Sequence, residues 1–541
     1  MVLIELLKDC GKKKDLCKGI RIHQEILKRG LLQQCPHIGN TLISMYAKCG
    51  ALSKARNVLN ELPNRNIISW NALIAGYAQN GQSHKAFDCF EKMQTEGLSP
   101  DAITFSCILT ACGNIGAIDK ANQIHNEILT RRLHEKNIVL GNGMVDMYVR
   151  CGYLGKARDV LNKLPHRDVI SWTTLISGYA IHGRVHEALS CLQQMQKDGI
   201  SPNEVTYLYI LKICGSTETI HIGKKIHVDI LRRGLLKKSI ALSNALVAMY
   251  AHYGLFSKAR KVLEEIPIRD VVTWNALITG YTEVGKGHEA MNCFELMQME
   301  GINPDASTLS CILKACGSTK YLGKGEEIHK EIIRRGLLEN DAVIGTALVD
   351  MYAACGALMT AHQVLDELPI REVSSWNALI AGYSEHGQCE KALVCFEWMK
   401  REGCSPDSIT FTSILKACSN IQALNEGRKI HIQIIQLGVE NHYSTGNALV
   451  AMYAKCRCLL DAQEVFNKLT LSDSISWTAL MVGYSEYGYE EKSLSLFDDM
   501  ESKGIDLDAF IFACALKACG NLEAFEKGQK IHLLIVLKEI E

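Results

Sequence analysis

The sequence predicts an all-α protein, a right-handed superhelical solenoid of about sixteen helix-turn-helix units. The first observation is a repeat: five of the six tryptophans recur at intervals of 102 or 101 residues, as Trp70, Trp172, Trp274, Trp376 and Trp477. The second is helical periodicity within each repeat, with apolar side chains three or four residues apart. Because one helical hairpin cannot bury its apolar face alone, such units must stack on one another.

The composition fits a folded repeat array. At 541 residues the chain exceeds the size at which a single core keeps growing, and 47% of its residues are hydrophobic. Lysine plus arginine equals aspartate plus glutamate at 59 each, so any nucleic-acid binding must come from local contacts rather than from bulk charge. The 22 cysteines are too sparse for a disulfide scaffold, and we interpret them as small core residues.

The two ends of the chain both match the repeat. The first 23 residues already resemble the segments downstream, so we identify neither a signal peptide nor a transit peptide, and we expect the chain to begin inside a unit. No apolar run of 18 residues predicts a membrane span.

Each unit is predicted to be a pair of helices. Segment 69–81 carries an apolar stripe at helical spacing, which Ser69 can cap, and Gly81 permits a turn. Segment 84–97 carries a second stripe, and Pro100 follows where the second helix should have ended. A helical hairpin results.

The units differ in length. Asn40, Asn71, Ser106 and Asn142 occupy equivalent helix starts, and their separations are 31, 35 and 36. A uniform 34-residue tetratricopeptide array is therefore excluded, and its W-x2-L-G-x2-Y pattern is also missing. The expected single solenoid, 1–541, divides into 1–35, 36–66, 67–101, 102–137, 138–168, 169–203, 204–239, 240–270, 271–305, 306–341, 342–372, 373–407, 408–442, 443–473, 474–508 and 509–541.

These unequal lengths, together with the phrases ISWNALIAGYAQNG, MYAKCG, LKACG and GLSPD, resemble the PLS subclass of plant pentatricopeptide repeat proteins over essentially the whole chain. In the terms of that family, the S units are 36–66, 138–168, 240–270, 342–372 and 443–473. The P units are 67–101, 169–203, 271–305, 373–407 and 474–508, and the L units are 102–137, 204–239, 306–341 and 408–442. Segments 1–35 and 509–541 are partial L units. The resemblance implies binding of single-stranded RNA, one base per unit, through the fifth and last residues.

An asparagine amide at the fifth position can both donate to and accept from a pyrimidine, whereas a threonine hydroxyl favours purines. By the resemblance, Asn with Asp implies uridine, Asn40 with Asn66 a pyrimidine, Thr173 with Asn203 adenine, Thr478 with Asp508 guanine, and Thr346 with Glu372 a purine. The Asn–Asp pairs are Asn71 with Asp101, Asn142 with Asp168, Asn244 with Asp270, Asn275 with Asp305, Asn377 with Asp407, and Asn447 with Asp473. The L units are left unread, and the expected target is 5′-YUNUANUUNRUNUG-3′.

The second residue of each unit is expected, by the same resemblance, to wedge between successive bases. The expected base-sandwiching residues are Ile68, Val139, Ile170, Val272, Val343 and Ile475. Ser374 is polar at that place, which predicts a weaker wedge.

Simpler interpretations compete with these. Asn and Asp at helix starts also serve as caps, and the recurring tryptophan fits core packing better than base stacking. Recurring arginine pairs such as Arg131 with Arg132 fit either phosphate contact or the helix dipole. His125 and Glu127 form the H-x-E half of a zinc deaminase motif, but no C-x-x-C accompanies it. We therefore expect no metal, no cofactor and no enzymatic activity.

The preferred function is the RNA-recognition array of a C-to-U editing factor in a mitochondrion or chloroplast. No E-type or DYW-type sequence precedes Glu541, so we expect editing to need either a missing C-terminal domain or a deaminase or other editing-complex protein in trans. The alternatives are an organellar factor that stabilises or processes RNA, and a helical scaffold that binds proteins. We expect a monomer with no membrane partner.

Overall fold

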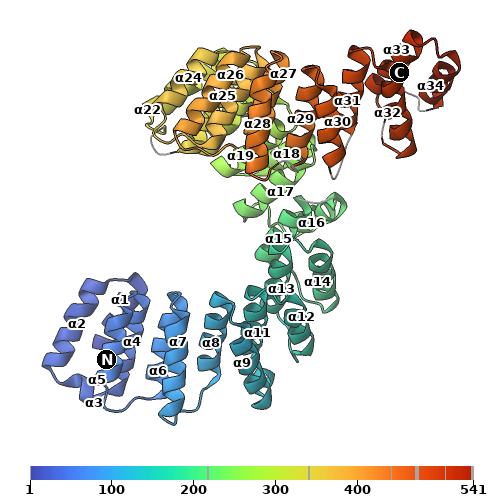
Figure 1. Ribbon diagram of the computed structural model, residues 1–541. Helices are drawn as coiled ribbons and strands as arrows, with labels where there is room; N and C mark the ends of the chain where they lie inside the picture. Colours follow the sequence, from blue (N-terminus) through green and yellow to red (C-terminus); the bar gives the residue numbers. More distant parts are fainter. Residues whose placement is uncertain are drawn as a thin grey trace. The chain divides into compact units, whose positions relative to one another are not determined.

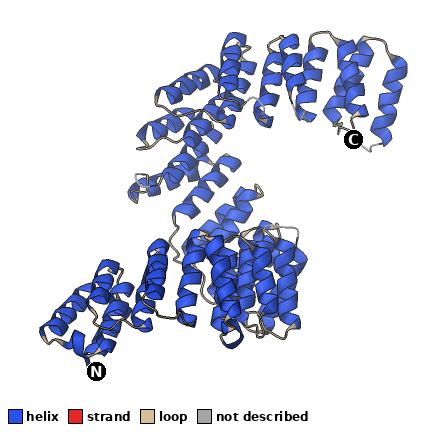
Figure 2. Ribbon diagram, turned by 60° about the horizontal axis from the view of Figure 1, so that its bottom comes forward, coloured by secondary structure: helices blue, strands red, loops and turns tan. Residues whose placement is uncertain are grey.

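The computed structural model describes residues 2–215, 219–338, 341–439, 442–469, 474–505 and 507–537. Every regular element in these ranges is an α-helix (Figure 2), which confirms the prediction of an all-α protein built of repeated helices. The chain forms two compact units, Met1–Ile268 and Arg269–Glu541. Each is described by itself below.

The helices of the first compact unit run in order along the chain (Figure 1). They are α1 (Val2–Lys13), α2 (Leu16–Lys28), α3 (Leu31–Gln34), α4 (Pro36–Lys48), α5 (Leu52–Glu61), α6 (Ile67–Gln79), α7 (Ser83–Thr95), α8 (Ala102–Ile115), α9 (Ile118–Thr130), α10 (Leu133–Lys136), α11 (Ile138–Arg150), α12 (Leu154–Lys163), α13 (Val169–Ile181), α14 (Val185–Lys197), α15 (Glu204–Gly215), α16 (Ile220–Arg232), α17 (Ile240–His252) and α18 (Phe256–Glu265).

The second compact unit continues the same alternation of first and second helices. Its helices are α19 (Val271–Glu283), α20 (Gly287–Met299), α21 (Ala306–Thr319), α22 (Leu322–Arg334), α23 (Ala342–Ala354), α24 (Leu358–Glu367), α25 (Val373–Glu385), α26 (Cys389–Arg401), α27 (Ser408–Asn420), α28 (Leu424–Gln436), α29 (Tyr443–Lys455), α30 (Leu459–Lys468), α31 (Ser474–Glu486), α32 (Glu490–Ser502), α33 (Ala509–Asn521) and α34 (Phe525–Leu537). The division into S, P and L units stays a prediction, and we keep those names for the segments.

The helices pack as two layers within each compact unit. A first helix such as α6 contacts its own second helix, α7, and the first helices on either side of it, α4 and α8. The same pattern recurs around α25, which contacts α23, α26 and α27. The first helices therefore form one continuous layer in each compact unit, and the second helices pack against it.

A missing side chain allows neighbouring first helices to approach closely. A Cβ added to Gly76 would lie 2.6 Å from the Cβ of Ala47, and one added to Gly382 would lie 2.6 Å from that of Ala353. Because a contact below 3.0 Å would force the helices apart, only glycine permits this spacing. The spacing matters because it sets the distance between the fifth residues of successive units.

The recurring tryptophans belong to the core. Trp70, Trp172, Trp274, Trp376 and Trp477 are between 1% and 4% exposed. The indole N–H of Trp70 donates to Glu96 Oε2 at 3.0 Å, and Glu96 also pairs with Arg65 at 2.6 Å. The packing interpretation is therefore right, and these rings are not available to stack on bases.

The recurring histidines join the second helix of each L unit to the first helix of the next S unit. His Nδ1 lies 2.7 to 2.9 Å from a tyrosine hydroxyl, and the two rings meet edge to face in every pair. The pairs are His23 with Tyr46, His125 with Tyr148, His227 with Tyr250, His329 with Tyr352, and His431 with Tyr453. Burial lowers the pKa of the first four histidines.

These histidines make the fold sensitive to acid. A histidine whose pKa is lowered by folding stays neutral in the folded chain but gains a proton in the unfolded chain below about pH 6.5, so stability falls as the pH drops through that value. We expect the unfolding temperature measured by circular dichroism to be lower at pH 5.5 than at pH 7.5. Replacing His329 by Gln should reduce the difference, whereas replacing the exposed His166 should not. An unfolding temperature that is equal at both pH values would contradict this account.

Candidate nucleic-acid interface

The last residue of a unit caps the first helix of the next unit. Asp101 Oδ1 accepts a hydrogen bond from the backbone N–H of Thr104 at 2.9 Å, and Asp168 Oδ1 accepts one from Ser171 at 2.8 Å. The same cap is made by Asn66, Asn203, Asp270, Asp305, Asp407 and Asp508. The capping interpretation of these residues is therefore right. It also fixes each side chain beside the preceding first helix.

Three P units bring their fifth and last residues into direct contact. The amide Nδ2 of Asn71 donates to Asp101 Oδ1 at 3.0 Å, and the pairs Asn275–Asp305 and Asn377–Asp407 repeat this bond at 3.0 Å. The second amide N–H of Asn71 makes no hydrogen bond within the described residues. Besides Asn71 and Thr104, the Asp101 carboxylate meets only the backbone N–H of Ile103, so its oxygens keep lone pairs for a ligand. Each pair therefore offers one donor and one acceptor to a ligand.

The aspartates of these pairs are ionised at neutral pH. Burial opposes ionisation of Asp101, but hydrogen bonds from the Thr104 backbone, from Asn71 and from the Thr104 hydroxyl outweigh it and lower the pKa. The pKa values of Asp305 and Asp407 are lowered by the equivalent contacts. An ionised carboxylate can only accept hydrogen bonds, so it requires an N–H on whatever it meets.

The S units bring their pairs together less tightly. Asn142 Nδ2 lies 3.1 Å from Asp168 Oδ1 and 3.3 Å from Oδ2, while Asn40 Nδ2 lies 3.5 Å from Asn66 Oδ1, which is the limit of a hydrogen bond. The amide oxygens of Asn40 and Asn142 are buried and have no partner among the described residues.

One P unit holds its pair through an intervening hydroxyl. Thr173 Oγ1 lies 2.7 Å from Thr206 Oγ1, which in turn lies 2.8 Å from Asn203 Oδ1. The structure thus links Thr173 and Asn203, although they do not touch directly. The consequences of this relay are developed below.

Other predicted pairs are not joined. Thr346 reaches only Ser374 Oγ, at 3.4 Å, and Ser374 lies 3.5 Å from Glu372 Oε2. Thr478 donates to the carbonyl of Ser474 at 2.6 Å instead of meeting Asp508.

For two further predicted pairs, the position of each member is given by itself. Asn447 is buried in α29, and Asp473 lies outside the described residues. Asn244 lies in α17 of the first compact unit, and Asp270 caps α19 in the second.

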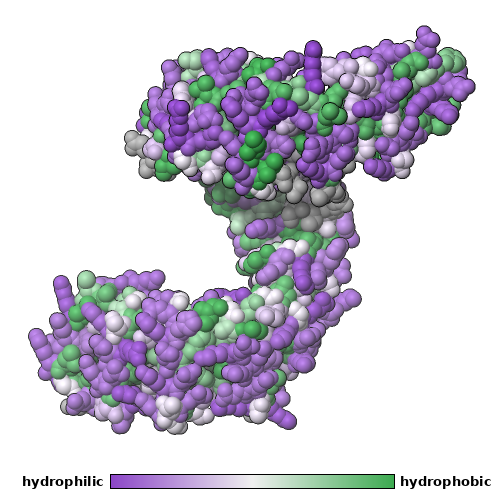
Figure 3. Space-filling view, viewed as in Figure 1, coloured by the Kyte–Doolittle hydropathy of each residue, from purple (hydrophilic) through white to green (hydrophobic). Residues whose placement is uncertain are grey.

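Ten of the described first helices carry a large, exposed apolar side chain at their second residue. The six predicted ones, Ile68, Val139, Ile170, Val272, Val343 and Ile475, are 54% to 65% exposed. Prediction missed Ile103, Val205, Ile409 and Phe510 of the L units, which are 46% to 61% exposed at the same place. Their position in the unit was the available signal. Most of the visible surface is hydrophilic (Figure 3). Exposed apolar side chains that recur at one place of the unit therefore need an explanation other than folding.

One pocket in the layer of first helices is lined both by a predicted base-reading pair and by exposed apolar second residues. It has a volume of about 370 Å³ and lies against α29, α31 and α33. Thr478 and Asp508 line it together with the apolar side chains of Ile475 and Phe510, and Lys455 is also in its wall. Its lining combines flat apolar contact with a few polar groups, as expected of a small-molecule or base-sized site.

Lysines recur on the same face of the L-unit first helices. The ninth residue of a helix lies seven places after the second and four after the fifth, so all three share one face. Exposed lysines occupy this place as Lys212, Lys314, Lys416 and Lys517. The layer of first helices thus combines exposed apolar side chains, polar pairs and positive charge.

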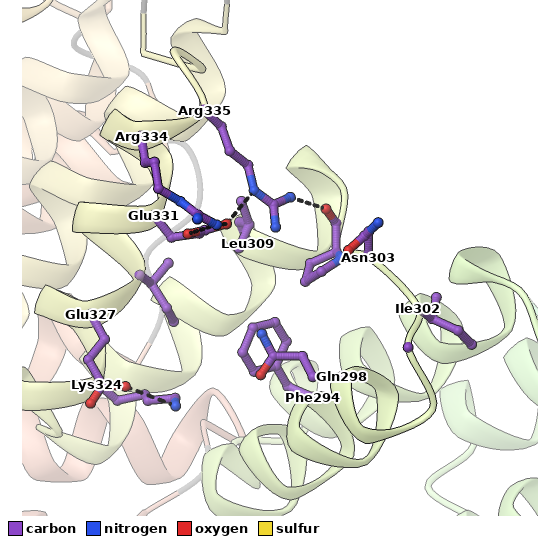
Figure 4. A pocket seen from close by; sticks show the side chains of 13 residues that line it. Phe294, Gln298, Ile302, Asn303, Leu309, Lys324, Glu327, Glu331, Arg334 and Arg335 are labelled. Atoms are coloured by element: carbon purple, nitrogen blue, oxygen red, sulfur yellow. Dashed lines mark hydrogen bonds and ion pairs between the residues drawn. The ribbon is translucent and has the colours of Figure 1, made fainter.

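The recurring arginines serve a different surface. Arg335, shown in Figure 4, donates to Glu331 Oε1 at 2.6 Å and to the Pro304 carbonyl at 2.7 Å. Arg131 donates to Glu127 and to the Pro100 carbonyl in the same way. The pocket in Figure 4 is about 340 Å³ and lies beside α20 and α22, so these contacts favour packing of the second helices over phosphate binding.

Two further features were sought in the described ranges, a metal-binding cluster and a membrane-spanning helix. No group of three or more His, Cys, Asp or Glu side chains there could hold a metal ion. No helix in those ranges is both long and apolar enough to cross a membrane.

Known families resemble this chain over most of its length. The profile described as "PPR repeat family" matches residues 65–114, 167–216, 269–318 and 371–420. The profile described as "PPR repeat" matches residues 40–67, 142–169, 242–271 and 475–505.

Relatives and solved structures agree with the profiles. A mitochondrial pentatricopeptide repeat-containing protein of Arabidopsis thaliana is 33% identical over 98% of this chain and 69% of its own length. A chloroplastic one from the same plant is 33% identical over 94% of this chain and 81% of its own length. The crystal structure of PPR10 from maize matches with a TM-score of 0.70 at 17% identity, covering 100% of this chain and 89% of PPR10. At that identity, the likeness concerns the fold.

Proposed function

Because the chain belongs to the pentatricopeptide repeat family, we propose that it binds single-stranded RNA by sequence, one base per unit. One observation carries the proposal: polar fifth and last residues are held together, beside exposed apolar second residues, along one layer of helices. Folding alone requires neither the exposure of those apolar side chains nor the switch between Asn and Thr at the fifth position.

The chemistry of the Asn–Asp pairs suits uridine. The Watson–Crick edge of uracil carries an N3–H between two carbonyl oxygens, so a carboxylate oxygen of Asp101 accepts that N–H while Asn71 donates to a carbonyl. Cytosine has a bare N3 at the same place, which the carboxylate repels. The pairs Asn275–Asp305 and Asn377–Asp407 share this geometry, and we assign uridine to them as well.

The threonine pairs suit purines. Asn203 keeps its amide N–H free to donate to adenine N1, and the Thr173 hydroxyl can accept from adenine N6–H. Asp508 instead requires an N–H and suits guanine N1–H beside Thr478 in the pocket that Ile475 and Phe510 also line. The full proposed target is 5′-YUNUANUUNRUNUG-3′, with the L-unit bases open.

The remaining exposed groups suit the rest of a nucleotide. Apolar second residues of successive units can enclose a base from both sides, and stacking of this kind tolerates any base. Lys212, Lys314 and Lys416 lie farther along the same helical face, where they can meet phosphates. Affinity would thus come from stacking and charge, and specificity from the polar pairs.

We further propose that the chain is the recognition array of an organellar RNA-editing factor of the PLS subclass, acting with a deaminase in trans. Two relatives with mitochondrial and chloroplastic names support an organellar location. The solved complex of PPR10 with an 18-nucleotide psaJ RNA element supports an RNA partner. The same array without editing, in RNA stabilisation or processing, is the alternative.

The first prediction compares two RNAs. RNA carrying the proposed target should bind at least tenfold more tightly than RNA in which the assigned uridines are changed to adenines, because each mismatch loses hydrogen bonds at a buried pair. Fluorescence anisotropy at fixed salt measures both affinities. Equal affinity would overturn the base assignments, and no binding to any RNA would favour a protein-binding scaffold.

The second prediction recodes one unit. Replacing Thr173 by Asn and Asn203 by Asp recreates the pair seen at Asn71 and Asp101, with Thr206 in the place of Thr104. Preference at the fifth base of the target should move from adenine to uridine, measured with RNAs that differ only there. An unchanged preference would show that unit 169–203 does not read its base.

A further inference from the structure

We propose that in four of the five P units a threonine of the following L unit fixes what the unit reads, so that Thr104, Thr206, Thr308 and Thr410 are positioning residues for base recognition. The inference rests on the proposed function and concerns the same site. Each threonine is the third residue of an L unit and is fully buried. None of them faces a base itself.

The contacts around Thr104 recur at two other junctions. Thr104 Oγ1 donates to Asn71 Oδ1 at 2.6 Å and lies 2.9 Å from Asp101 Oδ1. Thr308 makes the same bonds to Asn275 and Asp305 at 2.6 and 2.9 Å, and Thr410 makes them to Asn377 and Asp407 at 2.5 and 2.9 Å. The threonine hydroxyl thus contacts both members of the pair, although Thr104 and Asn71 are 33 residues apart in the sequence.

These contacts leave the asparagine amide one orientation. Its NH2 must face the ionised carboxylate, since two oxygens 3.0 Å apart would repel. Its oxygen then faces the threonine hydroxyl, which satisfies it in the buried site. Rotating the amide would break both bonds, so the donor that remains for RNA is always an N–H.

The directions of the hydrogen bonds among Thr173, Thr206 and Asn203 can be worked out in the same way. The backbone N–H of Thr206 lies 2.9 Å from Asn203 Oδ1, which identifies that amide atom as the oxygen. Thr206 must then give its only hydroxyl proton to Asn203 and accept one from Thr173. Thr173 therefore presents an acceptor and Asn203 presents N–H donors, the pattern that suits adenine.

The S unit of Asn142 provides a natural comparison because the hydroxyl at the equivalent place, Ser171 Oγ, makes no bond to the Asn142 amide. The Ser171 hydroxyl bonds only to the main chain of Asp168, donating to its carbonyl at 2.8 Å and accepting from its N–H at 2.9 Å. Asn142 accordingly keeps an unpartnered buried oxygen. Its amide is held only through Nδ2, by the Asp168 carboxyl at 3.1 Å, and not through its oxygen. This S unit should therefore discriminate less between uracil and cytosine than the P unit of Asn71, which carries the same Asn–Asp pair.

The test measures the ratio of affinities for RNAs that differ only as U or C at one base. In the wild-type chain, the ratio at the second base, read by Asn71 and Asp101, should exceed that at the fourth base, read by Asn142 and Asp168. Replacing Thr104 by Val, which keeps the shape and removes the hydroxyl, should lower the second ratio roughly threefold to tenfold and leave the fourth unchanged. Thr104→Ser should restore the second ratio.

A matched control and a gain of function guard against loss of folding. Ser171→Ala removes a capping hydroxyl without touching the reading amide, so it should leave the ratio at the fourth base unchanged. Ile511 occupies the same third position after Asp508, and Ile511→Thr should raise the preference for guanine over adenine at the last base. Unfolding temperatures of all variants report the structural cost.

The possible results distinguish a failure of the proposed role of Thr104 from a failure of the proposed function. Unchanged U-to-C ratios in Thr104→Val, or an equal fall of every ratio along the RNA, would reduce Thr104 to a helix cap and overturn this inference alone. A wild-type chain with no preference for U over C at the second base would overturn the proposed function itself.

Discussion

The structure depends on one recurring hydrogen bond, which in most of the described first helices joins the third backbone N–H to the side chain just before the helix. The bond caps the helix and thereby ends one helix pair and begins the next. Because it uses one carboxylate oxygen of Asp101, it also fixes the direction of the other. Capping is therefore compatible with the reading role that we propose for the same residue, because the cap orients the carboxylate oxygen that would meet the base.

The layer of first helices turns this local bond into a row of sites. Close approach at Gly76 and Gly382 sets the spacing of neighbouring first helices, and the length of the second helix sets how the next cap is placed. The fifth and last residues are 30 positions apart in the P unit of Asn71 but 26 apart in the S unit of Asn142. The two pairs also differ in their third partner, because the Thr104 hydroxyl donates to the Asn71 amide whereas the Ser171 hydroxyl bonds to the main chain of Asp168.

Much of this arrangement could be predicted from the sequence, because it follows from periodicity. The helices, the buried tryptophans and the packed histidines all repeat at a fixed interval, and the reading pairs fall at fixed places within it. The contacts of Thr104 could not be predicted, since they join residues 33 positions apart and depend on helix spacing. For the same reason the sequence did not indicate that Thr478 turns back to Ser474. Ile103 and Phe510 were overlooked because the L units had been set aside as unread.

The measurement that tests the central claim most directly is selection of bound sequences from a pool of fully randomised RNA. The account predicts an enriched 14-base motif that follows 5′-YUNUANUUNRUNUG-3′, with its sharpest positions at the bases facing Asn71, Asn275 and Asn377. The L-unit positions should stay variable. Enrichment of an unrelated motif, or of none, would contradict the claim that these pairs read RNA.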